Sequence, residues 1–177
     1  MSKVIQNGRI VTSDWQILTV AEGEEAEALS VPAGRVIVPL ATWLARREEL
    51  AARADVGVWF ASSEGPEALE ADIARLPVIA VNFPKFVDGR GYSTAVLLRT
   101  RYGYTGQLIA FGEVLRDQFN YLARCGFDTL QPREDRYTDA QLDAAIASIG
   151  DYSEPYQASV LHPQPMFRRI ARAGAKA

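Results

Sequence analysis

Short apolar runs alternate with longer stretches of helical spacing from residue 35 onward, and this alternation is the clearest structural signal in the chain. The apolar runs have the length and residue types of β-strands, and they cover residues 36–39, 56–60, 78–83, 107–111 and 129–132. The helical stretches that follow them begin near Thr42, Ser63, Tyr92, Val114 and Asp139. Parallel strands need helical crossovers, so the pattern predicts an α/β domain over residues 35–152, with a parallel sheet of about five strands.

Two architectures share this alternation, an open doubly wound sheet and a partial (βα) barrel. We favour the open sheet, because five units are too few to close an eightfold barrel. Before the domain, an Asn7-Gly8 turn between two β-type runs predicts a small hairpin within residues 1–20, and residues 15–18 favour a further strand. Residues 153–177 contain prolines and arginines, and we expect an extended, partly disordered tail.

Composition narrows the class of protein. The chain has 177 residues, 48% hydrophobic and 23% charged, which suits one well-buried soluble domain. A net charge of -3 and a pI near 5.3 argue against nucleic acid as the main partner, since phosphate binding needs a basic surface. The apolar runs are shorter than a membrane helix, and the polar start of the chain lacks the apolar core of a signal peptide. We therefore expect a cytoplasmic protein without membrane contact.

One cysteine and one histidine limit the metal and redox chemistry of the side chains. Cys125 alone excludes an internal disulfide, a Cys-x-x-Cys pair and a cysteine cage for zinc or iron–sulfur. It precedes Gly126 at the predicted end of a helix, where a packed structural cysteine is expected. His162 lies among prolines and is expected to be solvent-exposed. No metal site is predicted.

Positive charge gathers in the middle of the chain. Residues 1–77 hold 7 basic and 12 acidic side chains, a balance of -5, whereas residues 78–136 hold 8 basic and 6 acidic, a balance of +2. Loops at the carboxyl ends of parallel strands meet at one edge of the sheet, so the polar residues after three strands form one candidate site for an anion, a ligand or a partner. These residues are Asn82, Lys85, Asp88, Gly89, Arg90, Gly91, Tyr92, Ser93, Glu113, Arg116, Asp117 and Arg133.

The candidate site has two interpretations. Residues 88–93 combine glycines with a helix start, which are the elements of an anion pocket, and Lys85, Arg90, Arg116 and Arg133 would complete it by direct charge. They match neither the Gly-x-Gly-x-x-Gly dinucleotide pattern nor a phosphate loop. In the alternative, Asp88 and Ser93 cap the helix, and Arg90 pairs with an acidic residue of the next loop.

The acidic and aromatic residues of the site are open to the same two interpretations. Glu113 and Asp117 lie four residues apart at a helix start, where the helix dipole favours negative charge, so a capping role is preferred over acid–base chemistry. They are also the two carboxylates that could pair with Arg90. Tyr92 could stack on a ligand ring, although a hydrophobic staple for the helix explains it more simply.

Several stretches together resemble one known family. They are residues 7–11 with Asp14-Trp15, residues 38–44, the Phe-Pro-Lys-Phe and Asp-Gly-Arg-Gly-Tyr-Ser sequences within residues 82–93, residues 112–118 and residues 124–128. Over about residues 4–157 the chain resembles the bacterial domain-of-unknown-function family nine-three-four. Members are often labelled oxidoreductases, without established catalytic residues, and their genes typically lie beside those of assimilatory sulfite reductase. The resemblance implies a role in sulfate assimilation, and so in cysteine biosynthesis, that supports electron delivery to sulfite reductase.

This implied role meets a physical limit, because an electron carrier needs a redox centre. The chain has no cysteine set for iron–sulfur, no axial pair for haem and no standard dinucleotide motif, so it would borrow a centre or organise one. We therefore expect an accessory protein whose basic loops bind sulfite reductase or its electron donor. The alternatives are an oxidoreductase that holds a flavin phosphate or a small oxyanion through Gly89, Arg90, Gly91 and Arg116, and a sensor of a sulfur metabolite. Whether the protein is an enzyme is left open.

Overall fold

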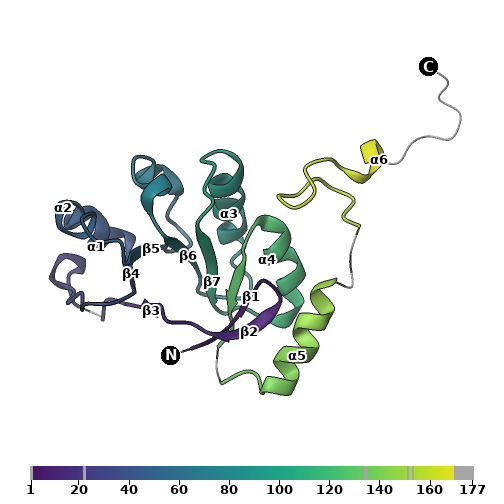
Figure 1. Ribbon diagram of the computed structural model, residues 1–177, viewed down its shortest axis with the longest axis horizontal. Coiled ribbons are helices and arrows are strands. Elements are labelled where there is room, and N and C mark those ends of the chain that lie inside the picture. The colour runs from purple at the N-terminus through teal and green to yellow at the C-terminus, as the bar shows by residue number, and fades with distance from the viewer. Residues whose placement is uncertain (1, 22, 134, 151, 153, 170–177) are drawn as a thin grey trace, which may run out of the picture.

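A computed structural model describes residues 2–21, 23–133, 135–150, 152 and 154–169 (Figure 1). Eight strands form one sheet in the order β2-β1-β8-β7-β6-β5-β4-β3. The strands are β1 (Lys3–Gln6), β2 (Arg9–Thr12), β3 (Gln16–Ile17), β4 (Val36–Pro39), β5 (Val56–Phe60), β6 (Val78–Phe83), β7 (Gln107–Gly112) and β8 (Thr129–Gln131). Strands β3 to β8 pair in parallel, and β1 pairs antiparallel with both β8 and β2.

The expected parallel sheet of about five strands, with a separate hairpin, is therefore wrong. The hairpin joins the main sheet, because β1 pairs with β8 through Ile5 and Leu130, and β3 adds a strand beyond β4. The result is an eight-stranded mixed sheet, although the α/β class holds in broad terms. The physical reason is that the free backbone groups of an edge strand favour pairing with another strand. For β1 of the hairpin, that strand is β8, more than 120 residues further along the chain.

The short link between β2 and β3 requires the sheet to curl. Thr12 ends β2 and Gln16 begins β3, yet these two strands are the opposite edges of the sheet. Four residues span at most about 14 Å, whereas the seven spacings of a flat eight-stranded sheet amount to about 34 Å. Figure 1 shows the hairpin and this link lying across the side of the sheet opposite α3 and α4.

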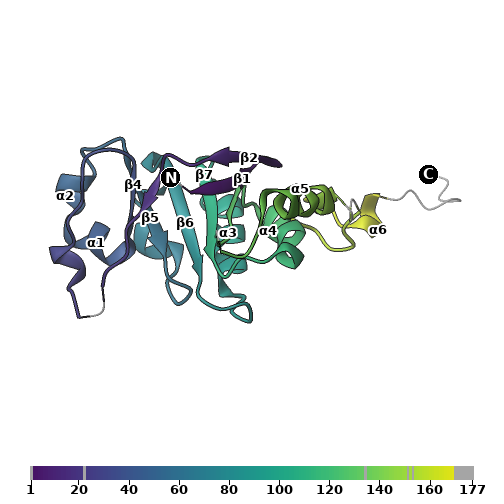
Figure 2. The same ribbon diagram turned by 90° about the horizontal axis from the view of Figure 1, so that it is seen from below.

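Helices cover the outer side of the curl. They are α1 (Leu40–Ala45), α2 (Arg47–Leu50), α3 (Arg90–Thr100), α4 (Phe119–Cys125), α5 (Asp139–Ala147) and α6 (Met166–Arg169), with 3-10 turns η1 (Ala26–Ala28), η2 (Pro66–Leu69), η3 (Ile73–Arg75), η4 (Arg116–Gln118) and η5 (Ser148–Gly150). Strands β4 to β8 follow one another in space as in sequence, so right-handed crossovers place all their connections on one face. Figure 2, seen from below, shows the strands in front of α3 and α4. No helix in the described part of the chain is long and apolar enough to cross a membrane.

Alternate residues of each strand enter two different cores. The larger core lies between the sheet and the helices and includes Phe60 and Phe83. The smaller one lies inside the curl, where Trp59 and Phe111 pack against Ala80 and its neighbours. The two rings meet edge to face with centroids 5.7 Å apart, although β6 separates their strands. Ala80 of β6 is the cross-strand partner of Trp59 of β5, and its small side chain leaves room for the Trp59 and Phe111 rings to meet.

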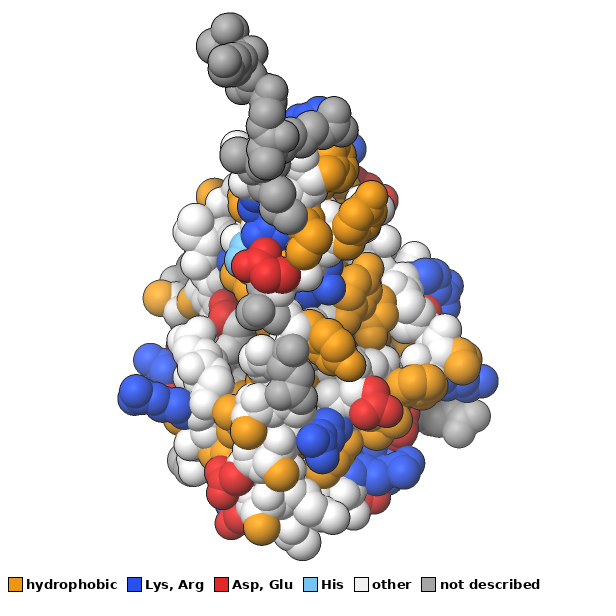
Figure 3. All heavy atoms as spheres, turned by 90° about the vertical axis from the view of Figure 1, so that its right-hand side faces the viewer, with side chains coloured by type: hydrophobic (Ala, Val, Ile, Leu, Met, Phe, Trp, Pro, Cys, Tyr) orange, Lys and Arg blue, Asp and Glu red, His pale blue; other side chains and the backbone are white. Residues whose placement is uncertain are grey.

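The described part of the tail packs against α4. The backbone N–H of Val160 donates to the carbonyl oxygen of Arg124 (3.1 Å), and Arg169 pairs with Glu154. Figure 3 shows hydrophobic side chains gathered around this segment. His162 is partly buried rather than exposed, whereas Cys125 is buried as expected, and burial raises the pKa of its thiol. The expectation for residues 170–177 lies outside the described residues.

Candidate functional site at the carboxyl edge of the sheet

The predicted site residues lie in loops at the carboxyl ends of β6, β7 and β8, but they do not form one cluster. Arg90 reaches the loop after β5, where its Nη2 donates to Ser62 Oγ (3.0 Å). Glu113, after β7, pairs instead with Arg133, after β8 (2.6 Å). The edge therefore carries two separate ion-pair groups, one over β5 and β6 and one over β7 and β8.

Asp88 and Arg90 form a closed local pair. Arg90 Nη2 donates to Asp88 Oδ2 (2.6 Å) and Nε to Oδ1 (2.9 Å), and the Arg90 backbone N–H also donates to Oδ1 (3.3 Å). These hydrogen bonds, with one from Ser62, hold the pKa of Asp88 well below its usual value. The alternative pairing of Arg90 with Glu113 or Asp117 is wrong, because Arg90 pairs instead with Asp88, only two residues away in the sequence.

Arg133 is shared between two carboxylates. Its guanidinium donates to Asp135 at 2.6 and 2.9 Å and to Glu113 at 2.6 Å, and the two partners raise its pKa. Arg136 adds a longer contact to Glu113 (3.3 Å). Glu113 is thus an ion-pair partner and not a free acid–base group. Its two arginines are already neutralised within the protein.

Arg116 and Asp117 belong to a third place on this edge. With Asn120, Ser148 and Tyr152 they line a cavity of about 380 Å³. Arg116 Nε makes a long contact with Ser148 Oγ (3.4 Å). Neither Arg116 nor Asp117 forms an ion pair with any described residue. This cavity is separate from the contacts of Arg90.

The start of α3 is packed against the sheet. A Cβ on Gly91 would lie 2.8 Å from Phe83 Cζ and 3.0 Å from Val81 Cγ1, so this glycine permits close helix–sheet contact. Tyr92 packs between Phe83 and Tyr121, with centroids at 5.2 and 4.8 Å, and burial raises its pKa. Tyr92 therefore supports the packing of the helix.

The predicted capping of the helix start is made only in part. Gly89 is the N-cap residue of α3, and no side chain caps the helix there. Ser93 is exposed, and its side chain bonds to no described residue. Of the two side chains expected to cap the helix, Asp88 accepts a hydrogen bond from the backbone N–H of Arg90, the first residue of α3, and Ser93 does not take part, while Gly91 and Tyr92 serve packing.

We expect Gly91→Ala to lower the free energy of unfolding by about 1–2 kcal/mol, because overpacking against buried Phe83 outweighs the better helix propensity of alanine. Gly89→Ala is the matched control, since its Cβ would meet nothing closer than Tyr92 at 3.5 Å. It should leave the free energy of unfolding nearly unchanged. Urea denaturation followed by circular dichroism measures both, and equal effects would contradict a packing role for Gly91.

The sequence-based site includes Lys85 but leaves out the two exposed apolar residues that follow it. Phe86 is 51% exposed and Val87 84% exposed, and they follow Lys85, which has no ion pair with any described residue. The signal was available, because two apolar residues in a turn after a strand cannot both reach the core. The loop tip is the segment Lys85, Phe86 and Val87.

Asn82 differs from the other predicted residues, because it points into the curl. It alternates along β6 with Val81 and Phe83, which face the helices. Its cross-strand partner is Phe111 on β7, whose own partner is Gln131 on β8. The row Asn82, Phe111 and Gln131 lies at the carboxyl end of the inner face, and sequence reasoning included only its first member.

Comparison with known proteins places the chain in a family. The model of the family described as bacterial protein of unknown function (DUF934) matches residues 57–167, more than half of the chain. The protein belongs to the DUF934 family. The DUF934 match begins in β5 and includes the loop tip and every candidate site residue.

The comparison with curated proteins adds no function to the DUF934 membership. No curated protein matches the chain. Among the described residues, no group of three or more His, Cys, Asp or Glu side chains is placed to hold a metal ion. The site must therefore be interpreted from its own geometry.

Proposed function

We propose that this DUF934 protein is an accessory protein of assimilatory sulfite reduction, which docks onto sulfite reductase or onto its electron donor. The observation that carries the proposal is the loop tip, where exposed Phe86 and Val87 stand beside Lys85. Exposed apolar side chains within a charged rim are typical of protein interfaces. The pathway itself rests on the family resemblance and on the gene neighbourhood that it implies.

The charges around the loop tip favour an acidic protein partner. Lys85 and Arg116 have no carboxylate partner among the described residues, so their charge is available to another molecule. Complementary charge would steer an acidic surface toward this edge. Arg90 and Arg133 are less suited to a free oxyanion, because Asp88 and Glu113 already hold them at 2.6 Å.

A docking role is also consistent with the lack of a recognisable redox-centre motif in the sequence. A protein that organises two partners needs no electron-carrying group of its own, because the donor and the reductase supply theirs. The apolar tip would fill a hollow on the partner, and the basic residues would set its orientation. The rate of electron delivery would then depend on how tightly the partner protein binds this edge of the sheet.

The test is Val87→Asp, which places a negative charge at the centre of the loop tip without touching the core. We expect about tenfold or greater loss of affinity for sulfite reductase or its donor in a titration with purified proteins. A deletion strain that carries this variant should grow poorly on sulfate and normally on cysteine.

Leu161→Asp is the matched control, because Leu161 is 59% exposed and lies in the tail beside Gly126. Gly126 precedes β8, so this position is at the amino end of that strand, away from the loop tip. It should bind and complement as the unaltered protein does. If Val87→Asp also complements fully, the loop tip is not the docking surface. If the unaltered protein binds neither partner, the assigned pathway is wrong.

A second candidate, an oxidoreductase that binds a small oxyanion or a flavin phosphate, is favoured by the cavity beside Arg116. An arginine without a carboxylate partner and the Ser148 hydroxyl are suitable groups for a phosphate or sulfite oxygen. The absorption spectrum of the purified protein and a titration with sulfite separate this candidate from docking. Flavin bands, or sulfite binding lost in Arg116→Gln, would favour it.

A further inference from the structure

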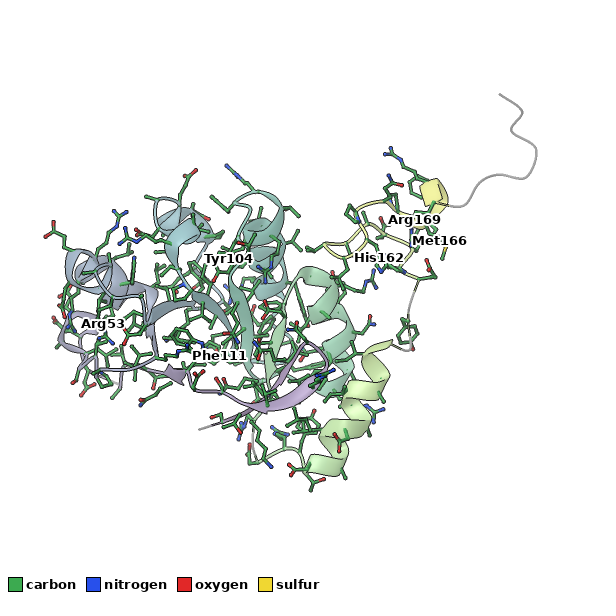
Figure 4. The ribbon with its side chains drawn as sticks, viewed as in Figure 1. Arg53, Tyr104, Phe111, His162, Met166 and Arg169 are labelled. Carbon is green, nitrogen blue, oxygen red and sulfur yellow. The ribbon has the colours of Figure 1, made fainter. Side chains whose placement is uncertain are left out.

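The inner face of the curled sheet ends in a row that has the chemistry of a ligand site. Asn82, Phe111 and Gln131 are successive cross-strand partners on β6, β7 and β8, so their side chains point to the same side. Figure 4 shows Phe111 on the side of the sheet that faces the N-terminal strands, away from α3. The carboxyl mouth of a curled parallel sheet is the usual place for ligands in (βα) folds.

All three side chains of this row are reachable. Each is partly exposed, although Val78, Ala80 and Ile109 below them on the same face are buried. Phe111 touches Trp59 edge to face, with an interplanar angle of 84°. Edge-to-face contact uses the edge of one ring and the face of the other, and it leaves further π surface of the pair for a ligand.

The two amides are unused within the protein. Neither Asn82 nor Gln131 has a side-chain hydrogen bond with any described residue. Gln107, on the same face at the other end of β7, donates its Nε2 to Thr129 Oγ1 (3.0 Å). The same face therefore contains one satisfied structural amide and, at its mouth, two that are open to a ligand.

The absence of a side chain at Gly112 leaves room for the Asn82 amide. A Cβ on Gly112 would lie 2.7 Å from Asn82 Oδ1, and its φ of +100° is one that other residues rarely adopt. The missing side chain lets the amide lean toward β7, next to Phe111. A side chain at residue 112 would therefore collide with the Asn82 amide and with the Phe83 carbonyl oxygen, 2.5 Å away.

We propose that this row binds a planar nitrogen heterocycle of nucleobase size. The heterocycle stacks on the aromatic pair, and the amides of Asn82 and Gln131 bind its edge. An amide offers both donors and an acceptor, which matches the mixed edge of such rings. Asn82 and Gln131 stand two strand spacings apart, about 10 Å between backbones, with Phe111 between them, so the two amides flank a ring that stacks on Phe111. The site lies inside the curl, so it is independent of the docking proposal.

Calorimetric titration of the full chain with AMP, nicotinamide mononucleotide and FMN tests the site. At least one of the three should bind, and ribose 5-phosphate, which lacks the ring, should bind far more weakly. Phe111→Leu should weaken the binding about tenfold or more, because aromatic stacking is lost. Asn82→Leu and Gln131→Leu should weaken it as well, by removing the edge contacts.

Two variants keep the result interpretable. Phe111→Tyr retains a ring for stacking and should bind as the unaltered protein does, which separates stacking from a folding defect in Phe111→Leu. Phe86→Leu changes an exposed aromatic on the loop tip outside the curl and should also bind normally. The proposal is overturned if none of the three nucleotides binds, if ribose 5-phosphate binds equally well, or if Phe111→Leu, folded by circular dichroism, binds unchanged.

Discussion

Arg99→Met is expected to lower the free energy of unfolding by about 3 kcal/mol, because it removes one partner of a largely buried ion pair together with several charged hydrogen bonds. The Arg99 side chain is only 13% exposed. Its Nε donates to the Gly126 carbonyl (2.9 Å), its Nη1 to the carbonyls of Tyr104 and Gly106 (2.7 and 2.9 Å), and its Nη2 to Asp128 (2.8 Å). Methionine fills similar space but donates no hydrogen bond.

The cost follows from where these acceptors lie. They belong to the segments that enter β7 and β8, so Arg99 joins the end of α3 to the amino edge of the sheet. Asp128 also accepts from the backbone N–H of Leu108 (3.1 Å), and without Arg99 its charge would be partly buried and unpaired. This is the edge opposite the loop tip.

Arg101→Met is the control for Arg99→Met, because Arg101 is exposed at the same helix end and only approaches the Tyr102 ring. Its effect should be near the error of urea denaturation followed by tryptophan fluorescence. Equal effects of the two variants would show that the Arg99 network contributes little. Because the loop tip is remote, folded Arg99→Met should retain partner binding at low temperature.

The positions of the parallel strands could be predicted, but the sheet that they form could not. Runs such as 78–81 and 108–111 are apolar throughout, as expected for strands covered on both faces, so their type is clear from sequence alone. Pairing of Ile5 with Leu130 depends on contacts far along the chain, which no local pattern encodes. The curl follows from the short link between Thr12 and Gln16, whose meaning depends on knowing that they are in opposite edge strands.

The crossover between β5 and β6 shows a local prediction overridden by a tertiary contact. Helical spacing predicts one helix from Ser63 to about Leu76, but the structure has two 3-10 turns, η2 and η3. The chain changes direction at Asp72, whose side chain points inward to Trp43. A buried carboxylate with its partners is a long-range feature, and helical periodicity does not reveal it.

The candidate site was located by topology but not resolved into its parts. The positions of the strand ends correctly predict which loops share one edge of the sheet. They do not predict that Arg90 pairs with Asp88, two residues away, rather than with an acidic residue of the next loop. Charges of both signs were abundant there, so composition could not select the pair. The inward row was detectable by period two, since Val78, Ala80 and Asn82 share one face of β6, but its neighbours Phe111 and Gln131 required the register.

Asp72→Asn is expected to lower the free energy of unfolding by about 2 kcal/mol at pH 7, because an amide offers one acceptor where three donors require a charged carboxylate. Asp72 is 2% exposed at its side chain. It accepts from Trp43 Nε1 (3.0 Å) and from Arg47 Nε (2.8 Å), and Arg75 lies 3.5 Å away. The cluster holds α1 and α2 to the crossover after β5.

The pH dependence of this effect has a definite sign. Burial by itself raises the pKa of Asp72, but the hydrogen bonds from Trp43 and Arg47 and the charges of both arginines outweigh it, so the pKa lies below its usual value. A carboxyl group with a lowered folded pKa stabilises the protein fully above its unfolded pKa of about 4, and this stability is lost as the pH falls through the folded pKa. The asparagine variant has no such group to protonate.

Urea denaturation of the unaltered protein and Asp72→Asn from pH 7 down to the lowest pH at which both fold measures this dependence. The difference between the two proteins should be constant down to about pH 5 and should shrink below about pH 4, where Asp72 of the unfolded chain takes up a proton while the folded protein still holds the carboxylate charged. Asp14→Asn, which changes an exposed partner of Arg35, should show nearly no difference at any pH. A difference that is constant or grows toward low pH would mean that shape and packing, rather than the charge of Asp72, stabilise this cluster.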